Sequence, residues 1–300
     1  MKLYAPNYYK DFHCIASDCK HSCCVGWEID IDQDSLSRYQ NMTHPYGEII
    51  RKHIQIEDDT ACFALTNEER CPFLKENGLC DMILNLGEDS LCQICRDHPR
   101  FYNFFSDREE LGIGLCCEEA ARLVLFQKEK TEVVMLSDNG ENEELWEEEE
   151  ELIALRDDLF DILQDGTLPL SERADRMLQE AGTKPISDLP LWIERLSNLE
   201  QLDVAWQKLL DKLATQEQTP KDLDLPLEKF MLYLLYRHLP NAEDESEIRA
   251  TVRFAYLGYL LIKTICENTN TPIEEAARLF SFEIEYSEEN TATLMAFLRE

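Results

Sequence analysis

The distribution of cysteine constrains this chain more than any other feature of its sequence. Of its 12 cysteines, all but Cys266 lie between residues 14 and 117. Thiols gather in this way because they are cross-linked, because they hold a metal, or because they react. We therefore expect the first part of the chain to differ from the rest in architecture and in chemistry.

The N-terminal residues argue against disulfide cross-links. They contain no apolar run of signal-peptide length, so we expect a cytoplasmic protein. Disulfides are rare in that reducing compartment, where clustered thiols are more often metal ligands or reactive groups. The longest apolar stretches, such as residues 254–262, are too short to span a bilayer.

The formal net charge of -32 limits the partners that such a chain can bind. A strongly acidic surface repels phosphate backbones and anionic lipid heads, so nucleic-acid and membrane binding are not expected. The same surface attracts a basic partner, such as an exposed lysine, although acidic surfaces also serve solubility alone. We interpret the acidic run at residues 147–151 as a solvated helix face.

The pattern of apolar residues predicts a mainly α protein with two parts. Residues 1–136 are expected to form a cysteine-rich, metal-binding domain with short strands, and residues 143–300 a helical, bundle-like domain. The turn-rich residues 137–142 mark the boundary. In the first part we expect strands at residues 27–32 and 131–136, a helix from Asp34 or Ser35, and a helix over 117–130.

The second part is expected to be a series of helices. One begins at Thr271, where a capping residue, a proline and a glutamate follow the order typical of helix starts. The others are predicted over residues 143–163, 171–181, 190–210, 225–239 and 247–267, and after Ser287.

The cysteine spacings point to a thiolate metal centre. Cys14, Cys19, Cys23 and Cys24 place four thiols within eleven residues. Soft thiolates select zinc or iron–sulfur clusters over hard cations. Since the spacing matches neither a zinc ribbon nor a ferredoxin, ligands must converge from distant segments. Further thiols flank a turn at Gly78, form a CxxC motif, and begin a predicted helix, namely Cys71, Cys80, Cys92, Cys95, Cys116 and Cys117.

The ligand prediction covers more thiols than one centre needs. Either two centres exist, or some of these thiols only pack or donate hydrogen bonds. An iron–sulfur cluster is our first hypothesis and zinc the alternative. The predicted ligands are Cys14, Cys19, Cys23, Cys24, Cys71, Cys80, Cys95 and Cys117, followed by Cys92 and Cys116.

Other residues near the thiols have plainer interpretations. Cys62 and Cys266 are interpreted as small buried hydrophobes. Three histidines beside cysteines, His13, His21 and His98, are interpreted as surface or packing residues. Arg96 and Arg100 flank the CxxC motif, where they can offset thiolate charge or bind a carboxylate.

The order of these motifs resembles a known family. It runs Phe12-x-Cys14-x4-Cys19-x3-Cys23-Cys24-x-Gly26-Trp27, Ile31-Asp32, Cys71-Pro72-Phe73-Leu74-x3-Gly78-Leu79-Cys80, Cys95-x2-His98-Pro99-Arg100 and Cys117-x-Glu119-Ala120-Ala121-Arg122. This order is similar to that of the bacterial flagellin lysine N-methylases. A motif near the C-terminus, Glu283-x-Glu285-Tyr286-Ser287-x2-Asn290, also resembles theirs. The chain departs from the family at His98, Glu118 and Tyr286, where an aromatic residue, proline and histidine are usual.

The resemblance implies methyl transfer from S-adenosylmethionine to lysine side chains of flagellin by a protein with an iron–sulfur cluster. The residues alone do not locate a cofactor pocket or a catalytic group. Gly112-x-Gly114 is the one candidate for a nucleotide-binding loop, and it lacks the βαβ frame that such a loop needs. The alternative is a non-catalytic zinc- or iron-chelating protein whose acidic helical part binds a basic partner.

Overall fold

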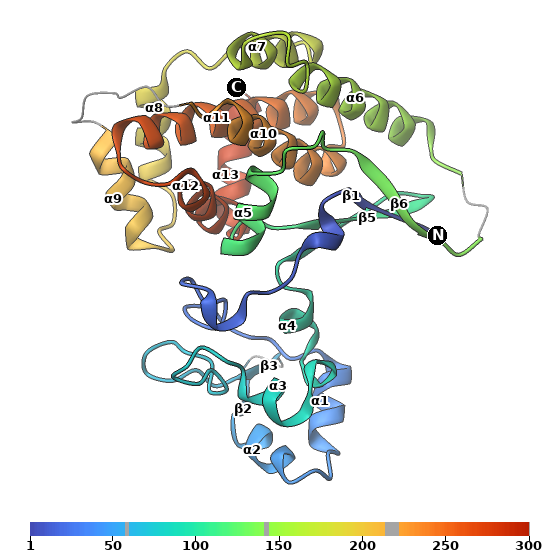
Figure 1. Ribbon diagram of the computed structural model, residues 1–300, viewed down its shortest axis with the longest axis vertical. Helices are drawn as coiled ribbons and strands as arrows, with labels where there is room; N and C mark the ends of the chain where they lie inside the picture. Colours follow the sequence, from blue (N-terminus) through green and yellow to red (C-terminus); the bar gives the residue numbers. More distant parts are fainter. Residues whose placement is uncertain (58–59, 141–143, 214–221, 300) are drawn as a thin grey trace. The chain divides into compact units, whose positions relative to one another are not determined.

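The chain folds into two compact units. The computed structural model describes residues 1–57, 60–140, 144–213 and 222–299. The cysteine-rich unit is His13–Arg100, and the helical unit joins Met1–Phe12 to Phe101–Glu300 (Figure 1). The sequence pattern placed the division between domains of residues 1–136 and 143–300 instead. The difference arises because the first strand pairs with strands that follow the cysteine-rich unit, which no local pattern reveals.

A four-stranded sheet draws the first residues into the helical unit. Strand β1 runs parallel to β5 and antiparallel to β6, in the order β4-β5-β1-β6. The strand predicted over residues 131–136 is confirmed as β6, two residues later. The strands are β1 (Lys2–Pro6), β4 (Arg100–Phe104), β5 (Arg108–Ile113) and β6 (Val133–Asp138).

Helices make up the rest of this unit, and the mainly α prediction is confirmed. The single helix expected over residues 190–210 is wrong, because the chain forms two helices there with a break at residues 198–203. The α-helices are α5 (Glu118–Leu125), α6 (Glu147–Leu163), α7 (Leu170–Glu180), α8 (Leu189–Ser197), α9 (Val204–Leu213), α10 (Asp224–His238), α11 (Glu245–Asn268), α12 (Ile273–Phe280) and α13 (Glu288–Arg299). Short 3-10 turns η1 (Tyr9–Asp11) and η4 (Leu239–Asn241) and the π-helix η5 (Ser281–Glu285) complete it.

The core of the helical unit is centred on α10 and α11, which pack side by side (Figure 1). Residues 229–236 of α10 are buried without a break. Gly258 of α11 allows the close approach, since a Cβ there would lie 2.8 Å from the Leu234 side chain and 2.9 Å from the Phe230 ring. Each large apolar side chain buried here stabilises the fold by about 1.5–3 kcal/mol, so this pair of helices is the main source of stability in the unit. None of the described helices is long and apolar enough to cross a membrane.

The cysteine-rich unit has shorter elements and a smaller core. Its described helices and strands are η2 (Ala16–Asp18), α1 (Gln33–Gln40), α2 (Tyr46–Lys52), β2 (Ile54–Glu57), β3 (Thr60–Phe63), α3 (Asp81–Leu86), η3 (Glu88–Ser90) and α4 (Gln93–Asp97). The strand expected over residues 27–32 is wrong: only one isolated bridge, from Asp30 to Cys62, forms there. Helix α1 begins slightly earlier than predicted, because the Asp32 carboxylate accepts the Ser35 amide at 2.8 Å and caps it.

Candidate functional site

Thiols from three separate segments gather in the cysteine-rich unit. The charges of Cys24, Cys71, Cys80, Cys92 and Cys95 influence one another, and all five side chains pack on the same apolar core. We call these five residues the thiol cluster. All of them are free thiols. Thiols from distant segments therefore lie in one group, and their role as metal ligands stays a prediction.

Backbone hydrogen bonds hold the segments of the thiol cluster together. The Cys71 amide donates to the Cys24 carbonyl at 2.8 Å. A tight turn between Lys75 and Leu79 returns the chain, so that Cys80 forms a bridge with Leu74. Gly78 has φ +78° in this turn, a conformation that glycine adopts without strain. The predicted Gly78 turn thus brings Cys80 back toward Cys71.

The CxxC motif lies at the start of α4. Cys92 is the N-cap residue, and the Cys95 thiol donates to the Cys92 sulfur. That hydrogen bond lowers the pKa of Cys92, whereas the same bond and burial raise the pKa of Cys95. Asp32 fixes this segment to α1, because its second carboxylate oxygen accepts the Gln93 amide at 2.8 Å. One aspartate therefore caps two helices beside the thiols.

The other thiols of the cluster differ in how easily they ionise. A hydrogen bond from Cys23 lowers the pKa of Cys24 to about 7, with further help from Ser22 and Arg70. Burial raises the pKa of Cys71 to about 12 and also raises that of Cys80. Cys71 and Cys80 are therefore neutral thiols in the metal-free protein, and a metal that bound them would have to displace their protons.

The thiol cluster fits a soft metal by its chemistry. Sulfur ligands from converging, partly buried segments suit zinc or an iron–sulfur cluster. Among the described residues, no group of three or more cysteine, histidine or acidic side chains already has the arrangement of a coordination shell. Metal binding by the thiol cluster therefore requires that the side chains rearrange, and it stays a prediction.

The structure gathers only part of the predicted ligand set. Cys24, Cys71, Cys80 and Cys95 belong to the thiol cluster together with Cys92, which the sequence ranked lower. The exposed Cys14 sulfur accepts the Ala16 amide at 3.4 Å, and the Cys19 thiol donates to the His21 carbonyl at 3.3 Å. Cys23 lies next to the cluster through its bond to Cys24. Cys117 belongs to the helical unit, where it is the N-cap residue of α5.

Trp27 links the first cysteine motif to the histidine that follows the CxxC motif. Its indole N–H donates to the Cys23 carbonyl, and its ring lies 5.6 Å from that of His98. Burial lowers the pKa of His98 to about 4, so the imidazole is neutral at physiological pH. His98 thus acts as a packing residue, as expected.

A second polar site lies in the helical unit around the C-terminal motif. The first residues of this motif, Glu283 to Glu285, lie in the π-helix η5, a rare element that often marks functional sites. Glu283 accepts the amides of Leu202, at 2.9 Å, and Asp203. These contacts satisfy backbone donors at the start of α9, which explains the break between α8 and α9. Asn290 holds the same loop through the amide of Glu200, at 3.0 Å.

Glu285 is the centre of this second site. Its fully buried carboxylate accepts from Tyr233 Oη at 2.9 Å, contacts His238 Nε2 at 2.7 Å, and pairs with Arg237 Nε at 3.4 Å. Burial opposes ionisation, but Arg237 and then His238 hold the pKa of Glu285 below its ordinary value. The carboxylate is therefore charged and fixes the direction of Arg237.

Aromatic rings enclose the Arg237 guanidinium. Its carbon lies 4.8 Å from the Phe101 ring centre and 5.1 Å from that of Tyr286. Tyr286 also shares a hydrogen bond with Cys116, whose pKa burial raises to about 12. Cys116 is thus a neutral thiol. The sequence patterns did not identify Tyr233, Arg237 and His238. The C-terminal motif, whose Glu285 they contact, was the one feature of the sequence that pointed to this region.

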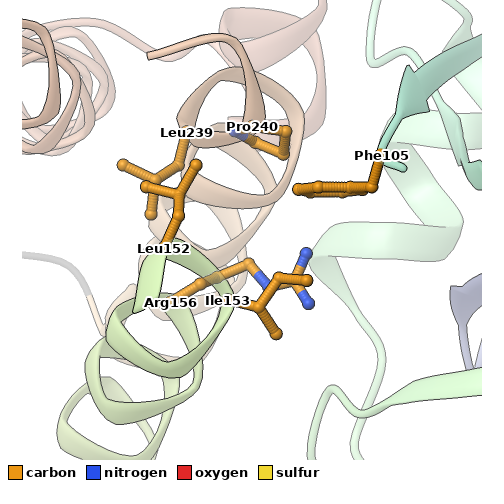
Figure 2. A pocket seen from close by; sticks show the side chains of 6 residues that line it. All are labelled: Phe105, Leu152, Ile153, Arg156, Leu239 and Pro240. Atoms are coloured by element: carbon orange, nitrogen blue, oxygen red, sulfur yellow. The ribbon is translucent and has the colours of Figure 1, made fainter. Parts of the chain in front are cut away.

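The chain does not build a cofactor loop at Gly112. A Cβ at Gly112 would lie 2.1 Å from the Phe101 ring, so the glycine makes room for this ring. A shallow pocket lies where Phe105 faces Leu239 and Pro240, with Arg156 at its side (Figure 2). It has no enclosed space that could hold a cofactor.

The fold and the thiol cluster define a mainly α, cysteine-rich protein with a candidate thiolate site, and comparison with curated proteins adds a relationship. The lysine-N-methylases of Salmonella choleraesuis (strain SC-B67) and Salmonella typhimurium (strain LT2) are each 26% identical over 129 residues, which cover 40% of this chain and 31% of theirs. The flagellar biosynthetic protein FliU of Salmonella muenchen is also 26% identical over 129 residues, and 75% of its length is covered. The chain is thus related to the flagellin lysine N-methylases.

The match has a limited extent. The match spans 31% of the length of these lysine-N-methylases. No family model matches the chain, and no solved structure matches it.

Proposed function

We propose that this protein transfers methyl groups from S-adenosylmethionine to lysine side chains of flagellin, and that its thiol cluster holds an iron–sulfur centre, with zinc as the alternative. The observation that carries the proposal is the convergence of five free thiols in a chain related to lysine-N-methylases.

The thiol cluster has the donors that such a centre needs. Cys24, Cys71, Cys92 and Cys95 supply four sulfurs, enough for zinc or for one cluster, and Cys80 is a fifth. When bound, the metal supplies positive charge that keeps these thiols ionised and cross-links their three segments. The turn at Gly78 and the double cap by Asp32 support the proposal, because they hold together the segments that carry these thiols.

The reaction also sets a demand on the lysine. A lysine amine must lose a proton before it attacks the methyl group, and at neutral pH this costs about 4 kcal/mol. Burial can supply part of this cost, as Lys229 illustrates: its side chain is buried, and burial lowers its pKa despite the nearby Glu228. An enzyme of this kind needs a comparable dry slot or a general base for the substrate lysine.

The proposal is tested with protein purified without oxygen and with its metal content measured. Incubation with S-adenosylmethionine and flagellin should add methyl groups to lysine, detected by mass spectrometry of the digested substrate. The variant Cys71→Ser/Cys92→Ser should lose both metal and activity, whereas Cys266→Ser, at a buried thiol of the helical unit, should keep both. Absence of methylation by the metal-loaded wild-type protein would refute the enzymatic proposal.

A second candidate is a non-catalytic metal-chelating protein whose acidic helical part binds a basic partner. One observation favours it: Gly112 makes room for the Phe101 ring and does not form a cofactor loop. Calorimetric titration with S-adenosylmethionine separates the two functions, because only the enzyme should bind it.

A further inference from the structure

An exposed aromatic surface lies on an edge strand of the helical unit. Strand β4 forms one edge of the four-stranded sheet. Side chains alternate along β4 and the residue that follows it. Phe101, Asn103 and Phe105 contact the helices, whereas Tyr102 and Phe104 face solvent with 39% and 68% of their surface exposed. The two exposed rings are nearly parallel, with centroids 6.4 Å apart and 14° between their planes.

The backbone of β4 directs a donor toward the open edge. The Phe105 amide donates to the Arg108 carbonyl in β5 at 2.9 Å. Amides alternate in direction along a strand, so that of Phe104 points away from β5. The Ser106 amide, next in the series, meets the Glu149 carboxylate at 3.1 Å. An acceptor already occupies the end of this edge, which shows that its donors are directed outward.

The same contacts bring an acidic segment to the edge. Residues 144–151 contain six glutamates and no lysine or arginine. Ser106 anchors this segment, because its hydroxyl donates to the Glu144 carbonyl at 3.1 Å and accepts the Trp146 amide at 3.1 Å. Trp146 is itself 67% exposed. The basic side chains near the turn between β4 and β5 already form ion pairs, since Lys2 and Arg108 both pair with Asp107.

We propose that the β4 edge, formed by Tyr102, Phe104 and Trp146 with the acidic segment 144–151, docks an extended lysine-bearing segment of the protein substrate. This inference rests on the proposed function, because it names where a lysine substrate is held. Main-chain pairing to β4 sets the direction of the segment, and alternate side chains then lie over the aromatic rings. Lysine suits both features: its ammonium is attracted to aromatic faces and to carboxylates.

Stabilisation of helix α6 by the acidic segment does not explain why aromatic rings are exposed beside it. Acidic residues in the first turn stabilise a helix such as α6 through its dipole. That role requires neither the exposed Trp146 nor the stacked rings on the neighbouring strand. Exposed aromatic side chains on an edge strand also invite self-association unless a partner or charge protects them. The strong negative charge of the chain, -32, opposes a second copy and favours a basic partner.

The experiment measures binding of a fluorescein-labelled peptide of alternating threonine and lysine by anisotropy, using the full-length protein. We expect Tyr102→Thr/Phe104→Thr to raise the dissociation constant about tenfold. Phe104→Pro should do the same by removing the outward amide, a change that edge strands tolerate. Phe126→Thr, at another exposed aromatic of the helical unit, should bind like wild type. Circular dichroism checks that each variant is folded.

A control peptide and a variant of the acidic segment test the roles of lysine and of charge. A peptide with glutamine in place of lysine should bind more weakly, and Glu147→Gln/Glu148→Gln/Glu150→Gln should reduce the dependence of binding on salt. Equal binding by wild type and Tyr102→Thr/Phe104→Thr would overturn the proposal. So would sedimentation that shows wild-type dimers and Phe104→Pro monomers, because a second copy would then occupy the edge.

Failure of the docking surface is distinguishable from failure of the proposed function. If flagellin is methylated by Tyr102→Thr/Phe104→Thr with an unchanged KM, the enzyme stands and the docking surface is refuted. If the lysine peptide binds at β4 but no methylation occurs under any condition, the docking surface stands and the enzymatic proposal fails.

Discussion

The two units of this protein are stabilised in different ways. The helical unit has a large apolar core around α10 and α11, and its polar site at Glu285 is fully paired within that core. The described part of the cysteine-rich unit has short helices, a two-stranded sheet of β2 and β3, and a small core that includes Cys71 and Cys92. Small cores rarely stabilise a domain alone. The difference supports the proposal that a metal bound by the thiols stabilises the cysteine-rich unit, as apolar packing stabilises the helical unit.

Metal removal is expected to have the largest effect and to separate the units. Treating the protein with a chelator should unfold residues 13–100 and leave the helical unit folded, because binding of a structural zinc ion is worth about 10–16 kcal/mol of folding free energy. Hydrogen exchange followed by mass spectrometry resolves the two units. Slow exchange in α1 and β3 after complete metal removal would show that the small core suffices.

Glu285→Ala should destabilise the helical unit instead. Removing this carboxylate leaves Arg237 buried without its counter-ion, which costs about 3–5 kcal/mol. Thermal unfolding of the helical unit should shift accordingly, whereas Glu289→Ala, at an exposed position, should not. A wild-type melting temperature in Glu285→Ala would contradict the central role of this carboxylate.

The lowered pKa of Glu285 also predicts that the stability of the helical unit depends on pH. The folded pKa of Glu285 lies below its ordinary value. The stability it contributes is therefore fully present above the unfolded pKa, about 4.3, and is lost as the pH falls through the lower folded pKa. Unfolding of the helical unit measured below pH 5 should be less acid-sensitive in Glu285→Gln than in wild type.

Gly112→Ala is expected to have an intermediate effect on the helical unit. The added Cβ would meet the Phe101 ring at 2.1 Å, and overpacking typically costs about 1–3 kcal/mol. Displacing Phe101 also disturbs one of the two rings around Arg237. Gly166→Ala is the matched control, because open space surrounds that position. Chemical denaturation should rank the two variants, and equal stability would indicate that Phe101 moves freely.

Asp32→Ala should have the smallest effect, within the cysteine-rich unit. It removes the cap of α1 and the contact to the Gln93 amide, and loss of a cap costs about 1 kcal/mol. Because Asp32 also positions α4, the variant should bind metal more weakly than Asp34→Ala, whose side chain is exposed. Metal competition with a coloured chelator measures this difference. Equal affinities would mean that α4 does not depend on Asp32.

Local patterns predicted most helices but not the division of the chain. Thr271, Pro272 and Glu274 predicted the start of α12 to within about a residue, because capping depends on neighbouring residues alone. The division at residues 12 and 100 depends on β1 pairing with β5 and β6, more than a hundred residues away. The break between α8 and α9 likewise depends on Glu283, 80 residues from Asp203. Contacts at such separations leave no periodic signal in a sequence.

The thiol cluster and the site around Glu285 could be predicted only in part, because they too depend on contacts between residues far apart in the sequence. Cysteine spacing identified the thiols, but it ranked Cys92 below Cys14 and Cys19. The structure brings Cys92 to the thiol cluster through its contact with Cys95 and leaves Cys14 at the surface. The arginine and aromatic residues around Glu285 come from α10 and β4, and each is an ordinary helix or strand residue when read alone.

The most direct test of this account is the metal content of the protein purified without oxygen, measured per chain by elemental analysis. Wild type and Cys266→Ala should each contain iron with acid-labile sulfide, or zinc, in a fixed ratio to protein, and Cys71→Ala/Cys92→Ala should contain none. Equal metal content in the wild type and in Cys71→Ala/Cys92→Ala, or no metal in any of the three proteins, would contradict the thiol cluster as the metal site.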